Sequence, residues 1–267
     1  MVTMMTSELA DAAFGADPGR WPLPPASSPE ELWLRAVAAG GQGRYGSARA
    51  DLAALLRGDG GRMSALAAAA LASFLRQQGW HEQAAHWDGR AFVDAAGDAE
   101  AAVDALTGLA ADALGVGRLA ASAALLQRAR LLHDRADGAP PRLAVRLAWV
   151  SAELAMAAGD GQSAVAHARR AVELVSPLAP ALRRHAVKSQ VVLAAALCSV
   201  GDREGSREVA DTAVIEAGEA GLVPLRWALA CLLGDIGSRR LSAGEVDRIR
   251  AADAGFVTRH GGRWNSR

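Results

Sequence analysis

The 267-residue sequence predicts an all-α protein built from repeated helical hairpins, and three observations lead to this fold class. Hydrophobic residues make up 51% of the chain but aromatic residues only 4%, and most of the apolar excess is alanine. Alanine is the best helix former, whereas strands favour β-branched and aromatic side chains. Glycine-containing turns recur at intervals of 36, 38, 42 and 42 residues, which is the range of helical repeats. Small residues recur at fixed distances from these glycines.

The register of the small residues locates the hairpins. The turn glycines are Gly43, Gly79, Gly117, Gly159 and Gly201. Ala or Ser stands seven residues before and five residues after every one of them, and Ala stands twelve residues after all but the first. Two antiparallel helices joined by a short turn approach closely only where the facing side chains are small. Hairpins are therefore predicted at about 29–57, 62–96, 98–135, 141–176, 180–220 and 223–252. The last of these, around Gly237, is degenerate, with Ala230 and Ser242 at small positions but Ile249 at the third.

The ends of the repeat region carry their own signals. Ser28, Pro29 and Glu31 form the pattern of a helix start, with an N-cap serine, a proline in the first turn and a glutamate three residues after the cap. Residues 1–28 lack a helical pattern, so we expect an extended or disordered tail, or a segment lying along the repeats. Residues 253–267 are expected to form a basic C-terminal tail. The repeat domain is therefore assigned to residues 29–252.

The repeat pattern resembles the tetratricopeptide repeat of bacterial helical repeat proteins, with Tyr45 in the first turn and Trp33 near the start of the first helix. The resemblance implies a right-handed α-α superhelix, or solenoid, of five to six hairpins. It also implies that the first helices line a concave groove that receives a peptide or a partner helix. The basic clamp that holds chaperone tails in some relatives uses asparagines, and this chain has none before Asn265, so that subtype is disfavoured.

The same register suggests which residues face the groove. Ten residues before the turn glycines lie Trp33 and Trp149, and thirteen before lie Glu30, Arg146 and Lys188. These columns predict a groove that changes from acidic to basic along its length. Trp and Arg are enriched at binding hot spots. The alternative for both tryptophans is packing between neighbouring hairpins. The expected partner-binding residues are Trp33, Arg76, Arg146, Trp149 and Lys188.

Several motifs that would imply chemistry are incomplete. Residues 41–46 match GxGxxG, but a helical segment precedes them where a dinucleotide-binding loop needs a strand. His81 and His86 are five residues apart, whereas two histidines that share a metal on one helix are four apart. The sequence has no GxSxG, P-loop or CxxC motif. We therefore expect no catalytic residue, no cofactor and no metal.

The charge and hydropathy of the sequence argue against nucleic-acid binding, secretion and insertion into a membrane. Lys and Arg total 29 and Asp and Glu total 29, so no net charge attracts nucleic acid, although arginines predominate from residue 235 onward. The N-terminus lacks the pattern of a secretion signal, and the apolar stretch 65–75 is too short to cross a membrane. Cys198 and Cys231 lie in apolar runs where a buried thiol is ordinary. A cytoplasmic location is expected.

Three hypotheses about function follow. The first is a non-enzymatic adaptor or scaffold that binds a protein partner through the groove. The second is a regulatory sensor that responds to a peptide or small ligand and acts on a transcription regulator or another partner. The third is an enzyme whose catalytic groups come together only on folding.

Overall fold

The computed structural model describes residues 2–58 and 60–265, and within these ranges the protein is all-α, with no strand. The regular structure of these residues comprises thirteen α-helices and the short 3-10 helix η1 (Ser176–Leu178). The α-helices are α1 (Val2–Ala13), α2 (Pro29–Gly41), α3 (Tyr45–Leu56), α4 (Arg62–Gln77), α5 (His81–Asp94), α6 (Ala99–Gly115), α7 (Leu119–His133), α8 (Arg142–Ala157), α9 (Gly161–Val175), α10 (Arg183–Ser199), α11 (Arg203–Glu219), α12 (Val223–Ile236) and α13 (Ala243–Arg259).

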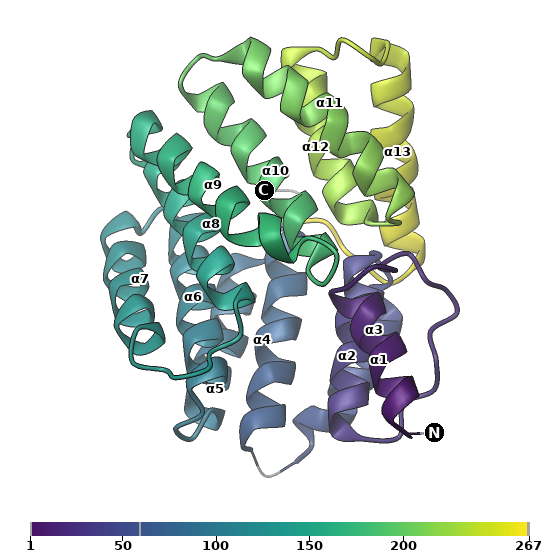
Figure 1. Cartoon of the computed structure of the whole chain (residues 1–267), viewed down its shortest axis with the longest axis vertical. Coiled ribbons are helices and arrows are strands. Elements are labelled where there is room, and N and C mark those ends of the chain that lie inside the picture. Colours follow the sequence, from purple (N-terminus) through teal and green to yellow (C-terminus); the bar gives the residue numbers. More distant parts are fainter. Residues whose placement is uncertain (1, 59, 266–267) are drawn as a thin grey trace.

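From α2 onward the helices form six successive hairpins, and each hairpin packs against the next (Figure 1). The predicted hairpins agree with these pairs to within a few residues, except at the end of the last. The first helices of neighbouring hairpins also contact one another, from α2 and α4 through to α10 and α12. The helices therefore form two rows, with the first helices in one row and the second helices in the other.

The turn glycines and small residues have the roles that the register predicts. The five turn glycines have φ between +76° and +86°, a conformation that strains any residue with a side chain. In the first five hairpins, the Ala and Ser residues at the predicted close contacts are all 0–1% exposed, and Leu55, the one large residue among them, is 9% exposed. The backbones of each helix pair approach closely because no larger side chain stands between them.

The start of α2 is capped as predicted. Ser28 Oγ accepts a hydrogen bond from the Glu31 backbone N–H at 3.2 Å, and the Glu31 carboxylate accepts one from the Ser28 N–H at 3.2 Å. These bonds satisfy amide groups that would otherwise lack partners at the helix start. The cap fixes the point at which the hairpin region begins.

The last hairpin differs from the prediction. Ala230 is buried as expected, but Ser242 is exposed and caps α13 instead of packing between helices. Helix α13 continues to Arg259, so the basic tail predicted for 253–267 is wrong over its first half. Arg267, which belongs to that predicted tail, lies outside the described residues.

The N-terminal prediction of an extended or disordered tail is also wrong for most of residues 2–28. Residues 2–13 form helix α1, which packs on α2 through a small core that contains Leu9 and Leu34. The segment after α1 then runs back across the molecule, where the Gln42 side chain donates hydrogen bonds to the Pro18 and Arg20 carbonyls. A side chain on Gly19 would meet the Ala220 backbone, so this segment also touches the turn before α12.

The last hairpin packs against the first, and the row of hairpins closes on itself (Figure 1). Val257 of α13 is fully buried in the same core as Tyr45 and other residues of the first hairpin. The Gly46 N–H donates to the His260 carbonyl at 2.7 Å, and the Asn265 N–H donates to the Gln78 carbonyl at 2.8 Å. The C-terminal segment therefore bridges the first two hairpins. This closure joins residues about 200 positions apart in the sequence.

Among the described helices, none has both the length and the apolar character needed to span a membrane.

The close contact in the fourth hairpin gives a test of the packing. Ala164→Trp on α9 should overfill a position that is 0% exposed and lower the free energy of unfolding by roughly 1 to 3 kcal/mol or more. Chemical denaturation would measure the change. Ala166→Trp, at an exposed position of the same helix, is the matched control and should cost much less. Equal stability of the two variants would contradict the assigned contact.

The closure can be tested at Trp264, whose ring stacks on Trp227 of α12 with centroids 4.2 Å apart and whose side chain packs against the first hairpin. Trp264→Ala should lower the free energy of unfolding by about 2 kcal/mol, since it removes a partly buried aromatic group from the junction. Trp21→Ala, at a side chain that is 45% exposed under Arg44, should cost less than about 1 kcal/mol. Thermal unfolding of both variants would measure the difference, and a Trp264 variant as stable as the control would show that the closure contributes little.

Candidate functional site in a central cavity

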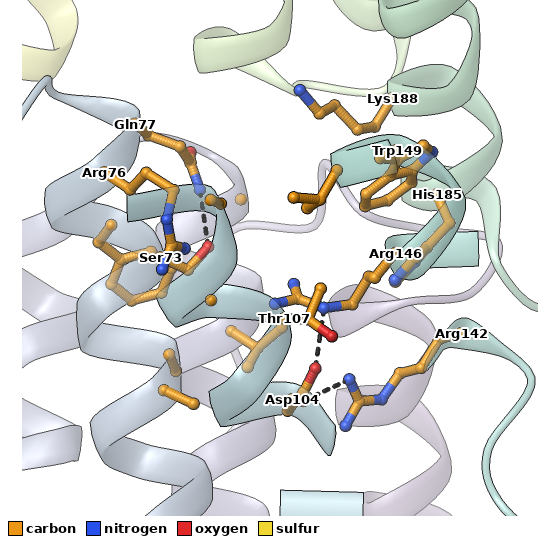
Figure 2. Close-up of a pocket in the computed structure, with 18 of the residues that line it drawn as sticks. Ser73, Arg76, Gln77, Asp104, Thr107, Arg142, Arg146, Trp149, His185 and Lys188 are labelled. Carbon is orange, nitrogen blue, oxygen red and sulfur yellow. Dashed lines mark hydrogen bonds and ion pairs between the residues drawn. The ribbon is translucent and has the colours of Figure 1, made fainter. Parts of the chain in front are cut away.

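A cavity of about 480 Å³ lies between the first helices of the hairpins. Residues of α2, α4, α6, α8, α10 and α12 line it, together with Phe14 and His81. Its size falls within the range of about 300 to 1,000 Å³ that is typical of ligand pockets. In Figure 2, one wall carries Ser73, Arg76 and Gln77, the opposite wall carries Trp149, His185 and Lys188, and Asp104 and Thr107 lie between them.

On α4, α6 and α8, lining residues recur three or four positions apart, which places them on one helix face. They are Leu66, Ala69, Ser73 and Arg76 on α4; Asp104, Thr107, Ala111 and Leu114 on α6; and Arg142, Arg146, Trp149 and Glu153 on α8. The inner face of each first helix therefore forms the wall, as the groove prediction expects.

All five predicted binding residues line this cavity, namely Trp33, Arg76, Arg146, Trp149 and Lys188. The predicted change from acidic to basic along the groove is wrong. Glu30 is exposed and does not line the cavity. Lys188 lies 3.3 Å from Glu153, and Arg146 lies 2.8 Å from Asp104, so opposite charges are paired across neighbouring helices instead of being separated.

Both tryptophans combine packing with a position on the cavity wall. Trp33 Nε1 donates to the Leu66 carbonyl at 3.3 Å, and Trp149 Nε1 donates to Ser189 Oγ at 2.9 Å. Each bond joins the first helix of one hairpin to that of the next. Both tryptophans therefore pack between neighbouring hairpins, as the alternative interpretation holds, and both also line the cavity.

A buried charge cluster links α6 to α8. Arg142, which is 7% exposed, donates to Asp104 at 2.7 Å and to Glu100 at 2.6 Å, and Arg146 forms an ion pair with the same Asp104 (Figure 2). Burial alone would raise the pKa of Asp104, but the two arginines outweigh it and hold the pKa below its usual value. The carboxylate is therefore ionised at neutral pH and fixes both guanidinium groups at the wall.

A second buried cluster lies behind the opposite wall. Arg76 donates to Asp88 and, through Nε at 2.8 Å, to Asp112. One guanidinium thus faces two carboxylates, and both carboxylates are buried. Burial raises the pKa of Asp88 well above its usual value; Arg76 opposes this effect, and the charge of Asp112 adds to it. Gly108 is required beside this cluster, because a Cβ there would lie 2.1 Å from an Asp88 oxygen.

The third charged group on the wall is Arg184 of α10, next to His185. Arg184 donates to the Val37 carbonyl of α2 at 3.3 Å, and no carboxylate among the described residues forms an ion pair with it. Burial lowers the pKa of Arg184 to about 10; Tyr45 opposes this effect, and the charge of Arg146 adds to it. Burial, followed by the charges of Arg184 and two further arginines, holds the pKa of His185 well below its usual value. His185 is therefore neutral at pH 7, while Arg184 stays charged.

Aromatic rings complete the wall around His185. The Trp149 ring stacks on the imidazole with centroids 5.2 Å apart and an interplanar angle of 21°. Phe14 lies 5.8 Å from the same imidazole and 5.7 Å from Trp33. Phe14 comes from the segment that we expect from the sequence to be a tail, so sequence reasoning misses it.

Sequence reasoning also misses Arg142, Arg184 and His185. The first two lie seventeen residues before the turn glycines Gly159 and Gly201, one helical turn before the column that holds Arg146 and Lys188. Extending the register by one turn would have found them. The same extension would have included His185, which lies three residues before Lys188. Nothing in the local sequence indicates that Phe14 reaches the cavity, because its position depends on contacts between distant segments.

The histidine pair weighed as a metal site is not brought together. His81 lines the cavity with Nδ1 3.6 Å from Asp112, whereas His86 is exposed with its ring edge against Trp87. Within the described residues, no group of three or more His, Cys, Asp and Glu side chains has the arrangement of a metal site.

The cluster around Arg76 predicts a dependence of stability on pH. Because the pKa of Asp88 is higher in the folded state than in the unfolded state, this group stabilises the fold below about pH 4, and its contribution is lost as the pH rises through the folded pKa. Asp88→Asn keeps the shape and removes the titration. The free energy of unfolding of wild type relative to this variant should fall with rising pH from about pH 4, by at most about 1.4 kcal/mol per pH unit.

Denaturation of both proteins at each pH would measure this difference. Asp112→Asn is the companion variant, since it removes the neighbouring charge that disfavours ionisation of Asp88. The pH dependence should be weaker in that background. A difference between wild type and Asp88→Asn that stays constant, or that rises with pH, would contradict the assignment.

Comparison with models of known protein families gives no match, and comparison with curated protein sequences gives no similar protein. The resemblance to tetratricopeptide repeats therefore rests on the residues of the repeat register, and the function is argued from the cavity itself.

Proposed function

We propose that the protein is a non-enzymatic binding protein that holds a small ligand in the central cavity and thereby regulates a protein partner. The observation that carries this proposal is the cavity of about 480 Å³ between the first helices of all six hairpins. Of the three hypotheses from the sequence, this is the regulatory sensor. A ligand in contact with every hairpin can alter how they pack together, which is the coupling that a sensor needs.

The size of the cavity favours a small ligand over a docked helix. One turn of an α-helix with side chains, about 10 Å across and 5.4 Å long, occupies about 420 Å³. A helix bound in a groove usually contacts it over two or more turns. The cavity has room for about one turn, so the adaptor hypothesis in its helix-binding form is the less favoured.

We also infer that the hairpins stack in the right-handed superhelix of tetratricopeptide proteins. This inference is supported by the positive φ of the turn glycines and by the burial of the small residues in their register. In such a superhelix the first helices line the concave side, which corresponds here to the wall of the cavity. The partner would then contact the second helices or the ends of the molecule.

The ion pairs and the burial of the carboxylates around the cavity support a non-enzymatic role. Asp104 and Glu153 are the carboxylates on the wall, and each is ion-paired to a cation. Asp88, with its raised pKa, is 1% exposed and lies behind Gly108 and Arg76, where a ligand in the cavity does not reach it. A general base needs access to the proton that it removes.

The test is to fill the cavity and to identify what binds to the intact protein. Ala111→Phe on α6 adds a ring at a position that lines the cavity, and Ala121→Phe on the exposed face of α7 is the matched control. The three proteins would be purified natively from the original cells and their bound molecules identified by native mass spectrometry. We expect about one small molecule per chain in wild type and in the control, and none in Ala111→Phe with unchanged helicity.

Two results would contradict the proposal. One is a bound molecule that Ala111→Phe retains, because the ligand would then lie elsewhere. The other is a wild-type protein that carries no ligand and whose melting temperature no compound of a metabolite library raises. Capture of the same stoichiometric protein by all three chains, with no small molecule, would favour the adaptor hypothesis instead.

A further inference from the structure

One cation on the cavity wall lacks a carboxylate partner among the described residues. Five cationic side chains line it, namely Arg76, Arg142, Arg146, Arg184 and Lys188. Four of them have a carboxylate partner within 4.0 Å. Among the described residues, Arg184 has only the Val37 carbonyl, at 3.3 Å. Because a cation partly removed from water is costly unless it is paired, Arg184 is the position on the wall where an anionic group would find an unpaired guanidinium.

Two further groups beside Arg184 lack hydrogen-bond partners. His185 is 5% exposed, lines the cavity, and its Nδ1 makes no hydrogen bond with any described residue. Arg146 Nε is buried and touches Asp104 only as an ion pair, without the geometry of a hydrogen bond. Buried polar groups in native proteins are almost always hydrogen-bonded. These groups and Arg184 therefore indicate a polar site that a ligand completes.

An aromatic surface adjoins His185 on the cavity wall. Trp149 and Phe14 lie against His185, and Trp33 lies against Phe14. Across the cavity, α4 and α6 contribute aliphatic side chains, including Leu66, Ala111 and Leu114, beside the polar side chains of Ser73, Gln77 and Thr107. A ligand that fits both parts has an apolar or aromatic body and one polar end.

We propose that the ligand is a small organic anion whose apolar or aromatic body lies among Phe14, Trp33 and Trp149 and whose negatively charged group pairs with Arg184. This inference rests on the proposed function and names the chemical class of its ligand. A single unpaired cation matches a single carboxylate, sulfonate or phosphate ester. A cationic ligand would add to the charge of Arg184, and a neutral one would leave it unpaired.

The experiment uses two probes that differ in one charged group. 8-Anilinonaphthalene-1-sulfonate has an aromatic body and a sulfonate, and N-phenyl-1-naphthylamine has the same body without the sulfonate. Fluorescence titration of the full chain should give one site for each probe, with the dissociation constant at least tenfold lower for the sulfonate. Arg184→Gln should raise the dissociation constant of the sulfonate at least tenfold and leave that of the neutral probe within about twofold. These factors follow from a charge-assisted hydrogen bond of about 1.5 to 3 kcal/mol.

Two control variants separate the possible failures. Arg169→Gln, at an exposed position on α9, removes the same charge far from the cavity and should change neither constant. Ala111→Phe should abolish binding of both probes. Circular dichroism and a cooperative melt would be required of every variant, because the sulfonate also binds partly unfolded chains.

The outcomes distinguish the two proposals. If Ala111→Phe abolishes both probes but Arg184→Gln affects neither, the cavity binds ligands and the anionic class is wrong. If wild type binds neither probe, or if Ala111→Phe retains both, the cavity is not the binding site and the proposed function fails. If Arg184→Gln and Arg169→Gln weaken the sulfonate equally, the effect comes from net charge, and the pairing with Arg184 is wrong.

Discussion

The contact between the first and last hairpins is the constraint on which the rest of the structure depends. A row of hairpins has two open ends, and its inner face is an open groove. Here α13 and the segment after it pack on the first two hairpins, and the segment after α1 reaches the turn before α12. The inner faces of the first helices are thereby turned toward one another. A surface that would be open in an extended solenoid becomes the wall of a cavity.

Enclosure changes the energetics of the charged residues on that wall. Arginines facing an open groove are solvated, and their partners contribute little. Facing the cavity they are partly removed from water, and Arg76, Arg142 and Arg146 each have a carboxylate held in place. The partner of Arg142 and Arg146 is Asp104, which lies about one repeat earlier in the sequence, and the partner of Arg76 is Asp112, also about one repeat away. The repeat spacing therefore brings opposite charges together, because equivalent positions of neighbouring first helices are adjacent in space.

The sequence predicts the features that depend on the local repeat and misses those that depend on contacts between distant segments. The hairpins are predictable because close packing at Ala164 or at the turn glycines is a local requirement that repeats five times. The cavity positions of the five residues predicted to bind a partner are predictable because the inner face follows the same register. Phe14 and the closure through Trp264 are not predictable, since each depends on contacts between segments that are far apart in the sequence. The length of α13 is missed for the same reason, because Val257 is buried by the first hairpin and not by its own repeat.

Arg184 belongs to both the closure and the cavity. It lies on α10 and donates to a carbonyl of α2, so it bridges the fifth hairpin and the first across the junction. In native proteins, departures from the usual pairing of polar and charged groups are found mainly at functional sites. Removal of a guanidinium from water without a carboxylate partner has a cost, and an anion bound to Arg184 would offset that cost in the folded state alone. A ligand that binds only the folded state raises the free energy of unfolding. The increase grows with the logarithm of the ratio of the ligand concentration to the dissociation constant. Binding at Arg184 would therefore tighten the junction that encloses the ligand, which couples occupancy of the cavity to the packing of the whole ring of hairpins.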